Sequence, residues 1–246
     1  MRSDTTPSGR RDLAAIWSAT HDRILDLLAD QPPSCADRPV PTLDGATVRD
    51  VLLHLADSAA CAAGGGDVAT TVLRLSSPQP DLTSTLKQLF AGWNSAVSGA
   101  GELTSDGRLL ALLITDAVMS EHDLRTALGT PGARDDVAVK VALDELAGRF
   151  SDRVAAARLP SLRVTVEQWG TIIGDGRASC CVVADRFEFV RAMSGRRSAP
   201  EISRWNWSDD PAPYLGVISE HDLPANEIRE RDPRVPEHMR DREFVL

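Results

Sequence analysis

The segment ITDAVMSEHDLRTALG, residues 114–129, contains three acids and one of the five histidines of the chain. It ends a longer stretch, from Gly107 to Leu128, in which polar residues are concentrated in the second half. Gly129 and Pro131 follow in the positions that commonly end a helix. The sequence therefore predicts that this stretch is one helix with a polar region near its end.

Helical geometry places three polar side chains of this segment on one face. At about 100° per residue, Ser120 lies about 40° from Asp116, and Asp123 lies about 20° from it on the other side. The stripe is apolar at both ends. Two interpretations stay open, a polar cavity that interrupts a helical core or a solvated helix face. His122 lies about 120° away and is expected to interact with the helix dipole or a neighbouring acid.

Three further helical patterns precede this segment. Apolar residues recur at three- and four-residue steps over residues 12–29. Thr47 and Asp50 form a pair related to the capping box, so a second helix is expected to start at about Val48 and to end at a triple glycine. A third stretch covers residues 82–100. Four helices predict a bundle, in which sites are usually built from side chains on facing helices.

His54 stands within DVLLHLA on the second predicted helix. A lone histidine on an apolar face is usually a satisfied core residue, but imidazole is also a common metal ligand. If the Asp116 stripe faces inward, its carboxylate can join the histidine from the facing helix. His54 and Asp116 are therefore a candidate metal pair, although two ligands are too few.

The second half of the chain changes character after a fifth predicted helix, residues 134–158. SLRVTVEQW alternates at period two and ASCCVVAD is a second short strand. The intervening GTIIGDGR, residues 170–177, is expected to form a hairpin or similar turn. The fold class is thus α+β, with a helical domain over 10–130, an α+β domain over 131–230 and a loosely attached tail over 231–246.

The composition limits the partners and the compartment. A length of 246 residues fits two modest domains, and 36 acidic against 27 basic residues argue against a nucleic acid or an anionic membrane surface as the main partner. The four cysteines form no CxxC pair, which argues against a zinc cluster or a redox motif. The sequence has no signal-like or membrane-spanning apolar run, so a cytoplasmic protein is expected.

Two features of the second half carry candidate chemistry. Arg196 and Arg197, in SGRRS, could bind a carboxylate bidentately, with solvated arginines after a helix end as the alternative. The aromatic RWNW segment with Tyr214 is either core or the wall of an apolar ligand site.

Four segments carry a family resemblance. VPTLDGATVRDVLLHLAD, SEHDLRTALG, DRFEFVRAMSGRRS and DDPAPYLG resemble, in the right order, the mycothiol-dependent maleylpyruvate isomerase family of actinobacteria, a branch of the DinB/YfiT-like superfamily. The resemblance covers about residues 10–230. It implies an N-terminal DinB-like four-helix bundle and a smaller C-terminal sterol-carrier-like α+β domain.

The resemblance also implies a divalent metal, typically zinc, held by three side chains. The family's first histidine falls on His54, its glutamate on Asp116 and its second histidine on Ser120. Aspartate keeps a carboxylate but is shorter by one methylene, and a neutral hydroxyl is a poor zinc ligand compared with imidazole. His122 could substitute only if the helix were locally rotated.

The implied function is that of a thiol-dependent isomerase or S-transferase. A bound metal would act as a Lewis acid that lowers the pKa of a thiol, so that mycothiol, as cosubstrate, adds to a small electrophilic substrate. Ser120 would be a weak ligand or would hold a water, and Arg196 or Arg197 would anchor a substrate carboxylate. The alternative is a metal-free member of the fold that binds a small molecule or a partner protein without chemistry.

Overall fold

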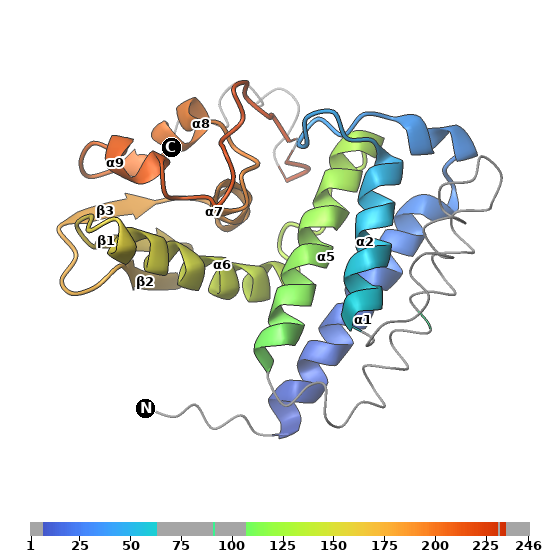
Figure 1. Cartoon of the computed structure of the whole chain (residues 1–246), viewed down its shortest axis with the longest axis horizontal. Helices are drawn as coiled ribbons and strands as arrows, with labels where there is room; N and C mark the ends of the chain where they lie inside the picture. The colour runs from blue at the N-terminus through green and yellow to red at the C-terminus, as the bar shows by residue number, and fades with distance from the viewer. Residues whose placement is uncertain (1–6, 63–90, 92–106, 231, 235–246) are drawn as a thin grey trace. The chain divides into compact units, whose positions relative to one another are not determined.

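The computed structural model describes residues 7–62, 91, 107–230 and 232–234. It contains an N-terminal helical part and a C-terminal part that mixes helices with a sheet (Figure 1). The N-terminal elements are α1 (Pro7–Ala29), the 3-10 helix η1 (Pro33–Asp37), α2 (Val48–Ala62) and α5 (Gly107–Leu128). The C-terminal elements are α6 (Val137–Ala156), β1 (Leu162–Val166), β2 (Trp169–Ile173), β3 (Cys180–Val183), α7 (Arg186–Met193), α8 (Ala199–Ser203), β4 (Asn206–Trp207) and α9 (Ala212–Leu215).

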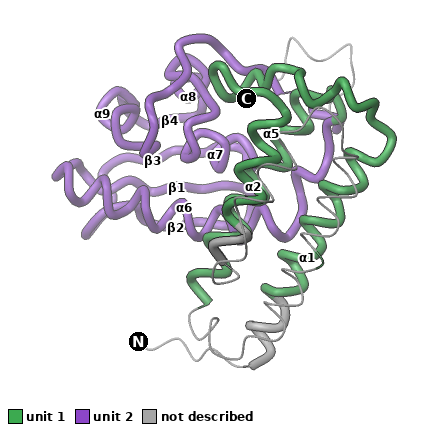
Figure 2. The backbone as a smooth tube through the Cα atoms, turned by 45° about the vertical axis from the view of Figure 1, so that its right-hand side comes forward, with its two compact units in different colours: residues 1–130 green, residues 131–246 purple. Residues whose placement is uncertain are grey.

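The chain divides into two compact units, residues 1–130 and 131–246 (Figure 2). Helices α1, α2 and α5 belong to unit 1, and the remaining elements belong to unit 2. The third helix that the sequence predicts, residues 82–100, lies outside the described residues apart from residue 91. Within the described part of the chain, no helix has both the length and the apolarity needed to cross a bilayer.

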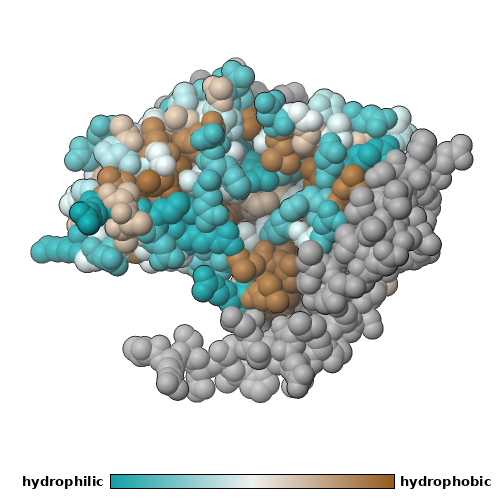
Figure 3. Space-filling view, viewed as in Figure 1, coloured by the Kyte–Doolittle hydropathy of each residue, from teal (hydrophilic) through white to brown (hydrophobic). Residues whose placement is uncertain are grey.

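Helix α5 is the central element of unit 1, and its observed bounds are those that the sequence predicts. Both α1 and α2 lie along it (Figure 1). From Ile114 to Leu124 every residue of α5 is buried except Asp116. At its first turns α5 meets solvent, and Figure 3 shows hydrophobic surface there, where Leu109 is exposed. Burial is therefore more complete over the polar half of α5 than over its leucine-rich start, where Leu110 is buried but Leu109 is exposed.

A buried carboxylate joins α5 to α1. Glu121 is fully buried and accepts hydrogen bonds from Arg23 Nε and Nη2 of α1, at 3.1 and 2.9 Å, and from Arg125 Nη2 at 2.8 Å. A buried charge is tolerated only when it is paired and hydrogen-bonded. Since Glu121 lies about 140° from Asp116 around the helix, this clamp directs one side of α5 toward α1 and leaves the Asp116 side for α2.

Helix α2 begins where the sequence predicts. Asp50 accepts a hydrogen bond from the Thr47 backbone N–H at 2.8 Å, and the Asp50 N–H donates to Thr47 Oγ1 at 3.4 Å. This reciprocal arrangement satisfies two backbone donors that the first turn of a helix leaves open. It confirms the capping pair and sets the phase of the turns that carry His54.

Unit 2 contains a four-stranded sheet in the order β2-β1-β3-β4. β1 pairs antiparallel with β2 and parallel with β3, and β3 pairs antiparallel with β4. One face of the sheet carries buried Leu162, Val164 and Val182, and α6 packs against β2 and against α7. A mixed sheet with helices and a helical N-terminal unit confirms the α+β class.

The prediction of a turn over residues 170–177 is wrong for its first half. Gly170–Ile173 belong to β2 and pair with β1, with Leu162 opposite Ile173. The hairpin turn lies earlier, at Glu167, whose φ is 53°. β-branched residues at 171–173 favour an extended strand, and this preference outweighs the turn signal of the flanking glycines.

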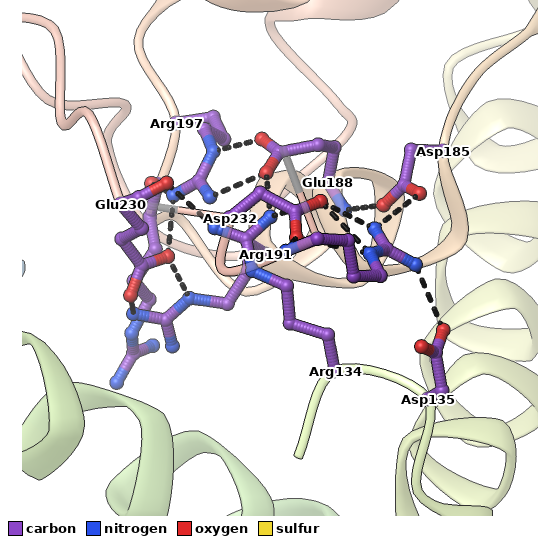
Figure 4. A network of polar contacts seen from close by, with 10 residues as sticks. Arg134, Asp135, Asp185, Glu188, Arg191, Arg197, Glu230 and Asp232 are labelled. Carbon is purple, nitrogen blue, oxygen red and sulfur yellow. Dashed lines mark hydrogen bonds and ion pairs between the residues drawn. The ribbon is translucent and has the colours of Figure 1, made fainter. Parts of the chain in front are cut away.

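Arginines and carboxylates form a connected network around α7 (Figure 4). Arg197, only 2 % exposed, donates to both oxygens of Glu188 at 2.5 and 3.0 Å and pairs with Glu230 at 2.8 Å. Fully buried Arg191 donates to both oxygens of Glu230 at 2.8 and 3.0 Å. Each buried guanidinium thus faces a carboxylate that compensates its charge.

The start of the predicted tail belongs to this network. Arg234 pairs with Asp135 at 2.9 Å and with Asp185 at 3.2 Å, and Asp232 is buried. Loose attachment is therefore wrong for residues 232–234. Its charge density suggested a solvated segment, but Arg234 pairs with acids that directly precede α7 and α6.

We expect Glu188→Gln to lower the free energy of unfolding by about 2–3 kcal/mol, because it removes the carboxylate that faces the buried Arg197 guanidinium. Glu227→Gln is the matched control, since Glu227 is similarly half-buried but pairs with the more exposed Arg204. Its effect should be clearly smaller, because its ion pair is screened by solvent. Denaturant unfolding measures both, and equal losses would contradict the role of the network.

Acid should weaken the same contact. Burial by itself would raise the pKa of the Glu188 carboxyl, but the charges of Arg197 and Arg134 and hydrogen bonds from Arg197 hold that pKa below its ordinary value. The resulting stability is present above the unfolded pKa of about 4.3 and is lost as the pH falls through the folded-state pKa. Below about pH 4 the Tm of the wild type should therefore fall more steeply than that of Glu188→Gln, and parallel profiles would refute this.

Candidate functional site

His54 of α2 and Asp116 of α5 face each other in unit 1. His54 Nε2 lies 2.6 Å from Asp116 Oδ1, a hydrogen-bond distance. The two side chains are 57 % and 32 % exposed, so solvent or a small molecule can reach them. The structure brings together the two residues that the sequence suggested as a candidate pair, and Asp116 is the one residue from Ile114 to Leu124 of α5 that is not buried.

The rest of the polar stripe faces the interior. Ser120 is 4 % exposed, and Asp123, 1 % exposed, accepts a hydrogen bond from Thr42 Oγ1 at 2.7 Å. Of the two interpretations of the stripe, the solvated helix face is therefore excluded. The stripe instead lines the contact between α5 and the segment that contains Thr42 and α2.

His122 is buried on another side of α5. It is 3 % exposed and lies about 120° around the helix from Asp116. This separation keeps its imidazole out of the His54–Asp116 contact. His122 thus belongs to the core of unit 1 and does not take the place of Ser120 in the stripe.

The two candidate anchor arginines lie in unit 2. The Arg197 guanidinium is already engaged by Glu188 and Glu230, so we assign it to the network around α7. Arg196 is half-buried, and its Nη1 donates to the Ser194 carbonyl oxygen at 2.5 Å. A substrate-binding role for Arg196 stays a prediction.

The residues of the site do not fit a zinc centre. Across the described residues, no three or more His, Cys, Asp or Glu side chains come together as metal ligands. Ser120 offers only a neutral hydroxyl. We therefore derive no chemical step through a metal.

The contact is instead suited to proton transfer. A carboxylate that accepts the Nε2–H proton fixes the tautomer of an imidazole and stabilises its protonated form. The other ring nitrogen, Nδ1, can then take up a proton from a group bound beside it. The same exposed pair could alternatively hold a polar ligand through hydrogen bonds alone.

Thr42 and Glu121 are site-supporting residues that the sequence analysis did not identify. Thr42 stands in a proline-containing connection, which has no hydrophobic periodicity from which the direction of its side chain could be predicted. Glu121 lies off the Asp116 stripe, and its partner Arg23 is 98 residues away. The one sequence signal for such a residue was Asp123, because an acid on the stripe of a buried helix requires a hydrogen-bond donor.

Comparisons with known proteins agree with the fold. Neither a protein-family model nor a curated protein sequence matches this chain. Its structure is similar to the crystal structure of the mycothiol-dependent maleylpyruvate isomerase, with a TM-score of 0.55 and 16 % identity over 83 % of this chain and 94 % of that one. A histidine-to-alanine mutant of that enzyme gives a TM-score of 0.48 and 17 % identity over 78 % and 90 % of the two chains. The chain thus has a maleylpyruvate isomerase-like α+β fold.

Metal analysis tests whether the residues of the site fail to hold zinc. Protein purified without chelator should contain far less than one zinc per chain, whereas the double variant Asp116→Glu, Ser120→His should take up about one, because it supplies a carboxylate and two imidazoles. Asp116→Glu alone is the control and should stay near the wild type. Elemental analysis and zinc titration give the measurement. Stoichiometric zinc in the wild type that disappears in His54→Ala would show that the misfit is only apparent.

Proposed function

We propose that this protein is an enzyme that activates the thiol of a low-molecular-weight cosubstrate for addition to a small electrophilic substrate. The reaction is an isomerisation through a transient thiol adduct or an S-transfer. The observation that carries the proposal is the 2.6 Å contact between His54 and Asp116 at a solvent-accessible point of a buried helix. The fold similarity to a mycothiol-dependent enzyme makes mycothiol the first thiol to test.

The position of the pair supports a chemical role over a stabilising one. Ion pairs with exposed partners contribute about 0–1 kcal/mol to stability, and both side chains here are accessible. Structural carboxylates of the same helix behave differently, since Glu121 and Asp123 are sealed in the interior. Asp116 is thus the carboxylate of α5 that can act on a bound molecule through His54.

In the proposed mechanism Asp116 holds the Nε2–H proton of His54, and Nδ1 accepts the proton of the thiol. The thiolate sulfur forms a bond to an electron-poor alkene carbon, while the π electrons move to the conjugated carbonyl oxygen. Rotation about the former double bond follows. The sulfur–carbon bond then breaks, the double bond re-forms, and the imidazolium returns its proton to sulfur. If the imidazolium protonates the adduct carbon instead, the S-transfer product is released.

Ser120 has a minor part in this proposal. Its hydroxyl lies one helical turn beyond Asp116 in the same stripe, and the side chain is buried. It is suited to hold a water or a polar substrate atom at the inner end of the site.

A second candidate function is binding without chemistry. The exposed His54–Asp116 pair would then recognise a polar small molecule. Turnover distinguishes the two functions, because only the first consumes a substrate.

We expect thiol-dependent turnover of small unsaturated acids, and we expect His54→Ala to lower kcat/KM by at least about 100-fold because it removes the proton acceptor. Asp116→Asn should lower it by about 10-fold or more, since the imidazole is no longer oriented by a carboxylate. Asp57→Asn, an exposed acid on the next turn of α2, is the matched control and should be neutral. The assay compares mycothiol, glutathione and no thiol.

Two outcomes count against the enzyme. Turnover that persists in His54→Ala would remove the pair from the mechanism. Binding of the same acids by calorimetry, without turnover by any thiol, would establish the second function.

A further inference from the structure

A second polar contact lies two helical turns from the His54–Asp116 pair. Thr42 Oγ1 donates to Asp123 Oδ1 at 2.7 Å, and both side chains are buried. Asp123 follows Asp116 by seven residues, which is about 10.5 Å along α5, and it lies about 20° from it around the helix. The two contacts therefore stand on the same face of α5, one exposed and one sealed.

Thr42 is presented by a closed turn that is fixed to the start of α2. The Val48 N–H donates to the Arg38 carbonyl at 2.9 Å, and the Val40 N–H donates to the Ala46 carbonyl at 2.9 Å. Gly45, with a φ of 71°, allows the chain to reverse there. Because these bonds join the turn to the first residue of α2, a contact of Thr42 with α5 also restrains α2.

Apolar packing does not set this register by itself. Val51, Leu52 and Leu55 of α2 are buried, but hydrophobic attraction is non-directional. A hydrogen bond weakens steeply with distance and angle. A shift of α2 by one residue moves each side chain about 1.5 Å along the helix axis and about 100° around it. This rotation would turn the imidazole of His54 away from Asp116.

Burial of Asp123 also carries an energetic cost. A carboxylate in the interior is less favourable than an apolar residue unless its hydrogen bonds repay the loss of water. A buried acid at this point fits a residue that specifies one register of two helices.

We infer that Asp123, through its hydrogen bond with Thr42, is a positioning residue that sets α2 so that His54 reaches Asp116. The consequence for turnover rests on the proposed function. The consequence for the His54–Asp116 contact does not, and it can be measured on the resting protein.

The test is the NMR signal of the His54 ring N–H proton, assigned by its loss in His54→Ala. Hydrogen bonding to a carboxylate shifts this resonance downfield, and Asp116→Asn gives the position without the carboxylate. Thr42→Val should move the resonance at least about half of the way to that position, and Thr42→Ser should restore it. Thr115→Val is the control, since Thr115 is buried on α5 but bonds only to the Ala111 carbonyl.

The same variants enter a double-mutant cycle on kcat/KM. Thr42→Val should lower it about 10-fold in the wild type and less than about 2-fold in Asp116→Asn, because the contact that it positions is already absent there. A purely structural role would give equal effects in both backgrounds. If Thr42→Val does not fold, as judged by circular dichroism, Asp123→Asn replaces it, with a smaller shift of the resonance expected.

The outcomes separate the two proposals. A His54 resonance unchanged in Thr42→Val, or changed equally in Thr115→Val, overturns the positioning role. A shift that Thr42→Ser reverses, in a protein without thiol-dependent turnover, keeps the positioning role and rejects the proposed function.

Discussion

The buried half of α5 imposes one constraint on unit 1: every charged or polar side chain within it must find a partner away from water. Glu121 meets this constraint with arginines of α1 and of its own helix, and Asp123 meets it with a hydroxyl. Asp116 meets it with His54 at the point where the helix reaches solvent. The packing of α1 and α2 and the place of the candidate site all follow from these three acids.

Unit 2 also pairs its buried charges, and its described residues contain more of them. Arg191 and Arg197 are buried, and Glu188 and Glu230 compensate them. These ion pairs hold the chain after α9 against α7. The network therefore has a structural role, whereas the His54–Asp116 pair is accessible to solvent. An arginine that neutralises a buried carboxylate is occupied, which is why the more exposed pair of unit 1 is the better basis for chemistry.

The departure from the metal-ligand set that the family resemblance implies gives the proposed function its particular form. With a serine at position 120, the interior end of the stripe provides a hydroxyl where a third strong ligand would stand, and the remaining histidine and acid bind each other. An imidazole oriented by a carboxylate can activate a thiol by proton transfer. The fold similarity to a mycothiol-dependent isomerase is compatible with this chemistry.

By itself, the sequence determined what depends on neighbouring residues: the bounds of α5, the Thr47–Asp50 cap and the face that Asp116 shares with Ser120, because helical period and capping are local. His54 and Asp116 could be paired once their two helices were expected to face each other. Tertiary structure alone decided that Thr42 meets Asp123 and that Arg23 meets Glu121, across 81 and 98 residues. It also drew residues 170–173 into the sheet and residues 232–234 into the network. In each case the packing of distant segments determines the partner, and such packing produces no periodic pattern in the sequence.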